Sequence, residues 1–541
     1  MKRMLALILA LILLVSLSLV MTSCTAKPKT GVEVLQDVRV RKALSLAIDR
    51  DYLNETVWNS SRMPAYALVP EGIIDTGVGT DFRKAGGDLM TSDYEKAVVE
   101  AKALLKQAGF ADGKNFPVLE LAYNTNTGHQ QVCEAVQAMW KENLGITVEL
   151  ASMEWNAFTE YRKTADCEIA RQGWLADYAD ASSFFDLFLT DAGTNDGHYS
   201  NTEYDKLVKE AKTSTDQAKR AELYHKAEKI IMDDMPMIPI VFYADDLLSQ
   251  TSYTGYGVTA TGNKMFFAVS KPETTVCVGS QPETLDPNMN QTVDGMIYVS
   301  HLFEGIYRQN VDGSFSLGQA KEVKQDGTKY TVTLRDDIFW SDGKPVTAHD
   351  FVFSWRRLVD PATASPYGYI GADFFKNGND VLGGTVAPDQ LSVKAIDDKT
   401  LEFELASEFP FTNELLAFPS LMPLREDIVS AASDSWSTVP ETLISNGRYV
   451  CDTIANESQI ILKKNDAYWD NASTTVTTIT FKLMSDDNAI LAAFKAGELD
   501  LVDSFPSDEL ASLESTPEFH RFGNLGLYYL QLNNAGPVEA K

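Results

Sequence analysis

The chain has 541 residues, of which 44% are hydrophobic and 10% are aromatic, so it is long enough to form two or three domains with large cores. Acidic residues number 76 against 47 lysines and arginines, which gives a formal net charge of −29 at pH 7. Such a surface repels nucleic acid and offers no basic footprint, which excludes nucleic-acid binding.

The first 24 residues follow the order of a secretory signal. Two basic residues precede an apolar run at 4–20, and small polar residues then lead to Cys24. A cysteine at this place is typical of a lipoprotein leader, although Met21 stands where leucine is usual. An uncleaved signal anchor is the alternative, but the apolar run is shorter than the roughly 20 residues of a spanning helix. We expect residues 1–24 to be a lipoprotein signal peptide, with the lipid on Cys24.

Residues 25–36 are polar and are predicted to form a tether. The chain then alternates between helical periodicity and short apolar strands, which predicts an α/β domain with a mixed sheet. The predicted helices are Val38–Ile48, Tyr94–Ala108, His129–Leu144 and Lys219–Met232, and the predicted strands are Val118–Ala122, Thr147–Leu150 and Ile238–Phe242.

From about residue 247 onward, strand and turn patterns dominate. Two alternating segments, Leu391–Ile396 and Thr400–Leu405, flank a polar turn and predict a hairpin. A strand–helix–strand unit is expected where apolar runs enclose a helical period, at Thr478–Leu483, Asn488–Gly497 and Leu499–Val502. The second half of the chain is therefore expected to be richer in strands than the first.

The sequence contains no motif of a common catalytic site. The nucleophile-elbow, zinc-protease, phosphate-loop and dinucleotide-binding patterns are absent. A segment starting at Asp286 resembles a calcium loop, but Gln291 replaces its glycine and Ile297 its final glutamate. We therefore predict neither an enzyme, nor a metal site, nor a cofactor.

Four cysteines beyond Cys24 lie inside apolar helix or strand patterns, far apart in the sequence: Cys133, Cys167, Cys277 and Cys451. An even number in an exported protein permits disulfides, and isolated buried thiols are the favoured interpretation. No C-x-x-C pair exists, which argues against structural zinc.

The segment at 169–178, IARQGWLADY, carries charges of both signs beside an aromatic residue. Arg171, Trp174 and Asp177 follow directly from an apolar strand. An extended zwitterion such as a peptide needs an anion for its ammonium group and a cation for its carboxylate, and each charge-assisted contact contributes about 1.5–3 kcal/mol. The alternative is that Asp177 caps a helix expected near Ala181.

Three segments resemble extracellular solute-binding proteins of family 5, the peptide-binding components of ABC importers. Residues 37–44 read DVRVRKAL, and 527–534 read LYYLQLNN. In that family a strand of the second kind runs directly into a helix of the first kind, in mid-chain. The family's usual beginning resembles Val276–Pro287, which here lies in the middle. The chain is therefore similar to a circularly permuted member, and either a permuted gene or a chimaeric assembly of the sequence explains this order.

The resemblance implies an α/β, two-lobed, periplasmic-binding-protein-like clamp (type II, peptide-binding class) with an extra inserted α+β domain, circularly permuted. One lobe is expected at 37–243 plus 526–541, the other at 244–303 plus 425–525, and the inserted domain at 304–424.

The same resemblance implies the site residues. Asp177 is expected to bind the ligand α-amino group, and Gly173 to allow close approach of a backbone. Gln531 replaces an acid that supports the ammonium group in some relatives. The other matched positions are expected to hold the ligand carboxylate (Arg171, Arg162 and His129), to wall side-chain pockets (Trp155, Trp174 and Tyr367) or to complete the contacts (Tyr529 and the Val293 backbone). Ordinary surface or core roles remain alternatives for each.

The implied function is that of a monomeric receptor, exported and lipid-anchored to the outer face of the cytoplasmic membrane. It captures oligopeptides between its lobes and delivers them to ABC permease subunits. Alternatives are the same clamp with another cargo, such as a dipeptide, signalling peptide, nickel chelate, haem or sugar, or a non-transporting permuted remnant.

Overall fold

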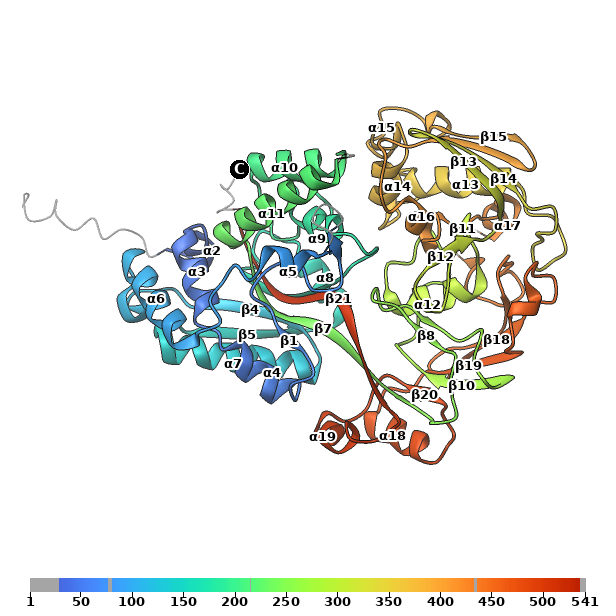
Figure 1. The fold of residues 1–541 in the computed structure, drawn as a ribbon. Coiled ribbons are helices and arrows are strands. Elements are labelled where there is room, and N and C mark those ends of the chain that lie inside the picture. The colour runs from blue at the N-terminus through green and yellow to red at the C-terminus, as the bar shows by residue number, and fades with distance from the viewer. Residues whose placement is uncertain (1–28, 76–79, 215, 433–434, 536–541) are drawn as a thin grey trace, which may run out of the picture.

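The structure is a computed structural model that describes residues 29–75, 80–214, 216–432 and 435–535. The predicted signal peptide and Cys24 lie outside the described residues. Figure 1 shows two lobes joined by a pair of long strands, β7 (Met237–Ser249) and β21 (Phe519–Leu532). The first lobe contains the N-terminal half of the chain, and the second lobe contains most of the remainder.

The first lobe is helix-rich. Its described helices are α2 (Gly31–Leu35), α3 (Val38–Leu46), α4 (Arg50–Val57), α5 (Phe82–Gly86), α6 (Tyr94–Gln107), α7 (Thr127–Leu144), α8 (Trp155–Tyr161), α9 (Ser182–Phe185), α10 (Thr202–Lys212) and α11 (Gln217–Asp234). Its strands besides β7 and β21 are β1 (Met63–Pro64), β2 (Ile74–Asp75), β3 (Thr80–Asp81), β4 (Leu119–Asn124), β5 (Val148–Met153) and β6 (Ile169–Leu175). The predicted helices and strands of this half all exist, and their ends shift by at most three residues, except that the strand predicted at Ile238–Phe242 continues to Ser249 as β7.

Polar side chains at the start of α3 explain its position. The Asp37 carboxylate accepts a hydrogen bond from the Arg39 backbone and caps the helix. The buried Arg41 guanidinium donates to the carbonyl oxygens of Leu35, 2.7 Å away, and of Asp234, 2.6 Å away. It therefore ties α3 to the end of α11, where unpaired helix carbonyls need donors.

The predicted tether at 25–36 is too long. Residues 31–35 form α2, which begins with a capping box between Thr30 and Glu33. Val34 and Leu35 are both 0% exposed and belong to the core of the first lobe. Burial of these two side chains outweighs the polar composition around them, so residues 30–36 belong to the first lobe.

One sheet runs through both lobes, in the order β17-β18-β19-β10-β20-β7-β21-β6-β4-β5, with β1 paired to β7. Strand β21 is antiparallel to both β6 and β7, and β4 is parallel to β5 and β6. The register between β21 and β7 shifts between Gly523 and Leu527, at the passage from one lobe to the other. The predicted lobe boundaries at 243 and 526 therefore fall inside continuous strands.

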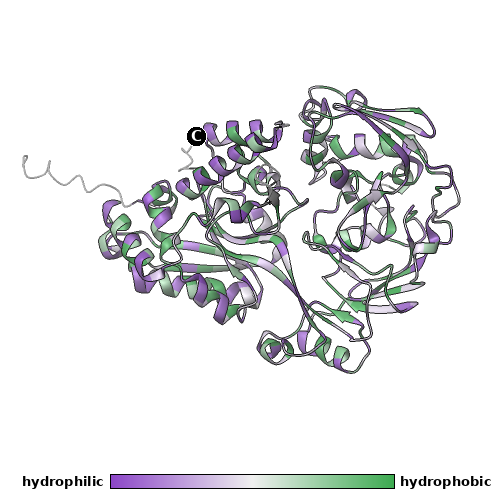
Figure 2. Cartoon of the chain, in the orientation of Figure 1, coloured by the Kyte–Doolittle hydropathy of each residue, from purple (hydrophilic) through white to green (hydrophobic). Residues whose placement is uncertain are grey.

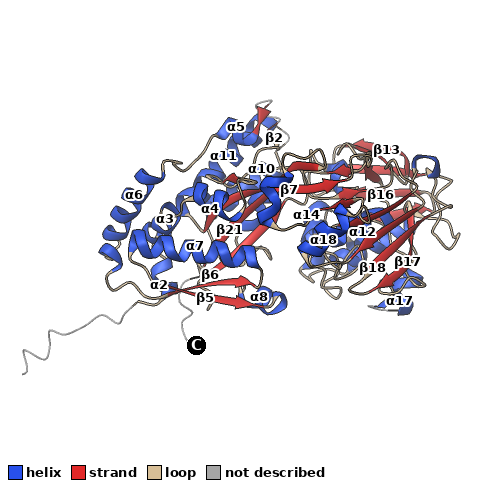
Figure 3. Ribbon diagram, turned by 90° about the horizontal axis from the view of Figure 1, so that it is seen from below, coloured by secondary structure: helices blue, strands red, loops and turns tan. Residues whose placement is uncertain are grey.

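The second lobe is richer in strands, as Figure 3 shows. Its elements in the shared sheet and beside it are β8 (Gly257–Val258), β9 (Lys264–Met265), β10 (Glu273–Cys277), α12 (Val293–Leu302), β17 (Tyr449–Ala455), β18 (Gln459–Lys464), β19 (Thr478–Lys482), α18 (Asp487–Lys495), β20 (Leu501–Val502) and α19 (Leu510–Leu513).

The segment expected to be an inserted domain, residues 304–424, contains a sheet of its own on the second lobe. Its main sheet has the order β13-β14-β16-β15 and includes the predicted hairpin. Its elements, with the helix that follows it, are β11 (Tyr307–Gln309), β12 (Phe315–Leu317), β13 (Ala320–Asp326), β14 (Lys329–Leu334), α13 (Ala348–Val359), α14 (Gly368–Phe374), α15 (Gly378–Leu382), β15 (Val393–Asp397), β16 (Thr400–Glu404), α16 (Thr412–Leu415) and α17 (Glu426–Ala432). Its apolar core is continuous with that of the second lobe.

The helices of the first lobe are two-faced, with hydrophilic colour concentrated on their outer sides in Figure 2. In α6, for example, the buried positions Ala97, Ala101 and Leu105 recur every four residues. Cys133, Cys167, Cys277 and Cys451 are all free and buried, which confirms the prediction of isolated thiols and contradicts the disulfide alternative. Among the described residues, no helix is both long and apolar enough to cross a membrane.

Candidate functional site

Strand β6 carries the predicted site segment and has a free edge. Along one side, all its residues from Ile169 to Leu175 pair with β21. Along the other, β4 pairs only with Ile169 and Ala170. From Arg171 onward this second edge has no strand partner among the described residues, so its backbone groups are available to an extended ligand.

Asp177 follows the end of β6 and meets the second lobe. Its carboxylate accepts hydrogen bonds from the hydroxyls of Tyr367, at 2.7 Å, and Tyr369, at 3.3 Å. The structure thus brings together two predicted site residues, Asp177 and Tyr367, that are 190 positions apart in the sequence.

The alternative role of Asp177 as a helix cap is wrong. Helix α9 begins at Ser182, and its backbone N–H donates to Asp180 rather than to Asp177. Asp180 lies two residues before the helix, which is the right reach for a local turn contact. The Asp177 carboxylate therefore does not cap α9, and its hydrogen-bond donors are the two tyrosines of the second lobe.

The protonation of Asp177 is shifted by its surroundings. Burial raises the pKa of its carboxyl to about 7, although the hydrogen bonds from Tyr367 and Tyr369 act in the opposite direction. No lysine or arginine forms an ion pair with Asp177 among the described residues. The carboxyl thus has two hydroxyl donors and no cationic partner.

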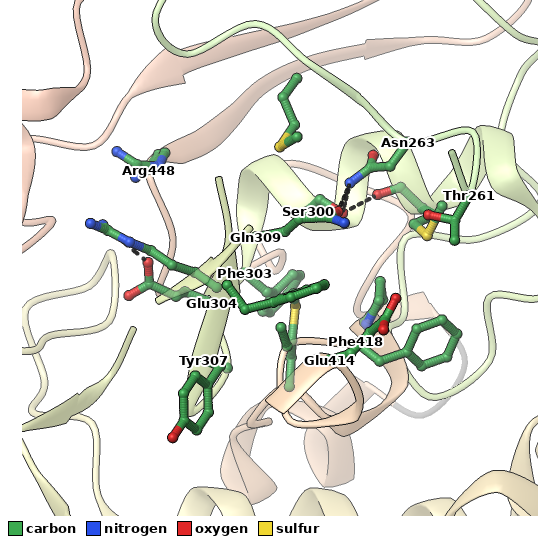
Figure 4. Close-up of a pocket in the computed structure, with 18 of the residues that line it drawn as sticks. Thr261, Asn263, Ser300, Phe303, Glu304, Tyr307, Gln309, Glu414, Phe418 and Arg448 are labelled. Atoms are coloured by element: carbon green, nitrogen blue, oxygen red, sulfur yellow. Dashed lines mark hydrogen bonds and ion pairs between the residues drawn. The ribbon is translucent and has the colours of Figure 1, made fainter. Parts of the chain in front are cut away.

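A pocket with a cavity volume of about 50 Å³, part of it open to solvent, lies between Asp177 and the second lobe. Figure 4 shows its labelled walls, which come from α12, β11, the α16 segment and the loop before β9. The apolar lining includes Phe303 and Phe418, and the polar lining includes Asn263, Glu414 and Arg448. Glu414 and Arg448 lie on opposite sides of the view in Figure 4.

Further contacts hold the first lobe against the 304–424 segment. The Ala179 backbone donates to Glu414 Oε1 at 2.9 Å, and the ring of Tyr178 stacks on that of Phe411 at 4.4 Å. Lys212 donates to Asp186 of its own lobe at 2.7 Å and to Asp373 of the other at 2.9 Å. The Asp177 site is therefore completed only when the lobes are in contact.

Arg171 forms a separate basic group on the first lobe. Its guanidinium donates to Asn124 Oδ1 at 3.3 Å and lies 5.1 Å from the centre of the Tyr528 ring. The Tyr528 hydroxyl is 3.4 Å from His129 Nδ1, and burial together with the Arg171 charge lowers the His129 pKa to about 3. His129 is therefore neutral, and Arg171 pairs with no carboxylate among the described residues.

Arg162 and Gln531 belong to a third group. Arg162 forms an ion pair with Asp196 at 3.0 Å and donates to Gln172 Oε1 at 2.9 Å. Gln531 accepts from Gln172 at 2.9 Å and donates to the Arg162 carbonyl. The side chain of Gln531 thus has its partners on the first lobe and pairs in register with Ala170, so it does not support the Asp177 end of the segment. A contact between Gln531 and the ligand stays a prediction.

The remaining predicted residues surround β6. A Cβ atom on Gly173 would lie 2.3 Å from the Tyr243 hydroxyl, which explains the glycine. Trp174 donates to Ser183, and Trp155 is 40% exposed with the Arg162 guanidinium 5.9 Å from its ring. The other two predicted positions are at the start of α12 (Val293) and in the core of the first lobe (Tyr529).

The sequence interpretation missed Tyr369, Glu414 and Asn263. All three come from the second lobe, and no local motif marks them. Tyr369 stands two residues after the predicted Tyr367 in YGY, which was the one available signal. Within the described part of the chain, no group of three or more histidine, cysteine, aspartate or glutamate side chains is placed to hold a metal ion.

Comparison with known proteins identifies the family. The pattern of the bacterial extracellular solute-binding proteins, family 5 Middle, matches residues 17–196 and 314–540. The chain belongs to this family of bacterial extracellular solute-binding proteins.

Individual relatives match about half of the chain. The oligopeptide-binding protein OppA of Bacillus subtilis is 37% identical over 241 residues, which cover 44% of this chain and 43% of that protein. The periplasmic oligopeptide-binding protein OppA of Salmonella typhimurium is 35% identical over 261 residues, covering 47% and 48%. The chain thus spans about half the length of the curated relatives it matches.

Solved structures of the same kind also match in part. The Haemophilus influenzae OppA complex with RPPGFSPFR has a TM-score of 0.43 at 32% identity, and the match covers 45% of this chain and 48% of that one. The unliganded open form of MppA, a periplasmic murein tripeptide-binding protein, has a TM-score of 0.44 at 32% identity, covering 49% and 50%.

Proposed function

We propose that this protein is the extracytoplasmic receptor of an ABC importer and captures oligopeptides between its two lobes. The family membership and the similarity to proteins named oligopeptide-binding support this function. The observation that carries the proposal is Asp177, an interlobe carboxylate with no cation partner among the described residues, beside a strand with a free edge.

The chemistry of the segment fits a peptide ligand. The free edge of β6 can pair with the amides of an extended backbone without reading its side chains. Asp177 offers an anion to the α-ammonium group, and Arg171 offers a cation without a carboxylate partner. A sugar or haem has no ammonium group and makes poor use of Asp177.

Calorimetry with a mixture of tri- to pentapeptides tests this function. We expect wild-type protein to bind at micromolar concentration or better, roughly −8 kcal/mol. Asp177→Asn should weaken binding of free peptides by about 10- to 100-fold, because a charge-assisted contact contributes about 1.5–3 kcal/mol, and should change binding of N-acetylated peptides much less.

Asp166→Asn is the matched control, because Asp166 is an exposed aspartate of the same lobe. It should leave both kinds of peptide unaffected. Absence of peptide binding, or equal losses for free and N-acetylated peptides in Asp177→Asn, contradicts the proposed role.

We also propose that the order of the two halves is a circular permutation of the family's order. The Gln36 side chain donates to the carbonyl oxygen of Asn533 at 3.2 Å, so the two segments that the family joins in mid-chain lie side by side. A variant that joins Asn534 to Thr30 through a short flexible linker, so that α2 is kept, and opens the chain before Lys271 should fold and bind the same peptides. Failure of this variant to fold contradicts the permutation.

We also propose a lipid anchor at Cys24. Cleavage before Cys24 and lipid attachment to its thiol would tether a monomeric receptor to the outer face of the cytoplasmic membrane, within reach of its permease subunits. Growth with an alkyne-labelled fatty acid should label the wild-type protein, and Cys24→Ala should abolish the label. Labelling that persists in this variant contradicts the anchor.

A further inference from the structure

Three carboxylates line the interlobe pocket: Asp177, Glu414 and Glu304, and Glu304 lies 3.8 Å from the Arg308 guanidinium. Glu414 Oε1 accepts the Ala179 backbone N–H, whereas Glu414 Oε2 has no hydrogen-bond partner among the described residues. Ala179 is two residues after Asp177, and two residues of chain span at most about 7 Å. Asp177 and Glu414 thus both line this pocket, linked through the short stretch of backbone from Asp177 to Ala179.

The pocket's basic residues do not neutralise Asp177 or Glu414. Arg308 donates to Asp470 at 2.8 Å, and Arg448 donates to the hydroxyls of Ser473, at 2.7 Å, and Thr474. In Figure 4 Arg448 lies across the pocket from Glu414. Among the described residues, neither Asp177 nor Glu414 forms an ion pair.

An independent observation also indicates a missing donor. Asn263 lines the same pocket, is 3% exposed, and its Oδ1 has no hydrogen-bond partner. Its amide nitrogen is already directed to Ser300 Oγ at 3.2 Å, as Figure 4 shows. A buried acceptor without a donor costs free energy unless a ligand supplies one.

We propose that Glu414 is a specificity-determining residue that makes this pocket select peptides whose first residue is basic. The inference rests on the proposed function, because Asp177 must already hold the α-ammonium group. The side chain of the first residue then enters the pocket. Phe303 and Phe418 pack against its methylene groups, and its terminal cation reaches Glu414. Burial raises the pKa of Glu414 to about 7, and a cation bound beside this carboxyl would favour its ionised form.

Three tetrapeptides that differ only at the first residue test the inference: lysine, norleucine or glutamate followed by three alanines. Norleucine resembles lysine in its hydrocarbon chain but has no charge. We expect wild-type protein to bind the lysine peptide about tenfold more tightly than the norleucine peptide, and the glutamate peptide most weakly. Glu414→Gln should reduce the preference for lysine over norleucine to twofold or less.

Glu414→Gln suits this test because the glutamine oxygen can still accept from Ala179, so the lobe contact is kept. Glu408→Gln is the matched control, since Glu408 is an exposed glutamate of the same segment, and it should keep the tenfold preference.

Equal affinity of wild-type protein for the lysine and norleucine peptides overturns the inference while leaving the proposed function intact. So does a preference that persists in Glu414→Gln, or a preference for glutamate. Failure of all three peptides to bind contradicts the proposed function itself.

Discussion

The two charged ends of the β6 segment are built in different ways. At the acidic end, Asp177 comes from the first lobe, whereas Tyr367, Tyr369 and Glu414 come from the second. At the basic end, Arg171 and its neighbours all belong to the first lobe. The basic end therefore exists whatever the position of the lobes, whereas the acidic end is complete only when they meet. A ligand ammonium group that binds there favours the closed arrangement.

A third group shows that not every arginine near β6 is available to a ligand. Arg162 already pairs with the buried Asp196, whereas Arg171 pairs with no carboxylate among the described residues. Arg162 is therefore tied to a carboxylate of its own lobe. Arg171, two residues before Gly173 on strand β6, is the candidate cation for a ligand.

Arg162→Met should have the largest effect, on stability. It leaves the Asp196 carboxylate buried without its partner, which we expect to lower the free energy of unfolding by about 3 kcal/mol. Denaturant titration measures the loss. The double variant Arg162→Met with Asp196→Asn should recover part of it, and peptide affinity should change less than twofold. A large loss of affinity with normal stability would assign Arg162 to the ligand instead.

Gly173→Ala should have the next largest effect. The added Cβ would lie 2.3 Å from the Tyr243 hydroxyl, so the half-buried tyrosine ring must move, at a cost of about 2 kcal/mol. Thermal unfolding checks the stability, and the double variant with Tyr243→Phe, which removes the clashing hydroxyl, should restore most of it. Unchanged stability of the single variant would show that β6 and Tyr243 are not packed as described.

Arg171→Met should weaken peptides with a free carboxyl terminus about tenfold, equal to the loss of about 1.4 kcal/mol. Amidated peptides of the same sequence are the control and should lose little. In a series of peptides of three to six residues, the loss of affinity should differ most between free and amidated peptides at the length whose terminal carboxylate reaches Arg171. Equal losses for free and amidated peptides at every length would remove Arg171 from the ligand site.

The smallest expected effect is that of pH on the acidic end. An ammonium group binds the ionised form of Asp177, whose pKa is about 7, so affinity for free peptides should be about fivefold weaker at pH 6 than at pH 7. Calorimetry at both pH values measures this ratio, and Asp177→Asn should remove most of the dependence.

The stability of the unliganded protein should respond to pH with the opposite sign. The folded state holds the Asp177 proton more tightly than the unfolded chain does, so this contribution is full below about pH 4 and is lost as the pH rises through about 7. Glu414, whose pKa burial also raises to about 7, acts in the same direction. Tyr367 and Tyr369 stay protonated because burial raises their pKa. Urea titrations at pH 5 and pH 8 check the sign.

The sequence by itself determined the elements whose causes are local. The apolar periods of α3, α6, α7 and α11 predicted these helices to within two residues at nearly every end, because each helix buries one face of its own residues. The segment around Arg171, Trp174 and Asp177 was also found locally, because its charges and aromatic ring are close in the chain.

Only the tertiary structure decided what those residues meet. The contact between Ala179 and Glu414 joins positions 235 residues apart. A local rule offered Asp177 the role of a helix cap, but α9 has no side-chain cap, and the Ser182 N–H donates to Asp180. Likewise, the polar composition of residues 25–36 predicts a tether, whereas the structure buries Val34 and Leu35 in the core of the first lobe. The physical reason is the same in each case: burial and long-range hydrogen bonds depend on which surfaces come together, and that information is not contained in any short stretch of the chain.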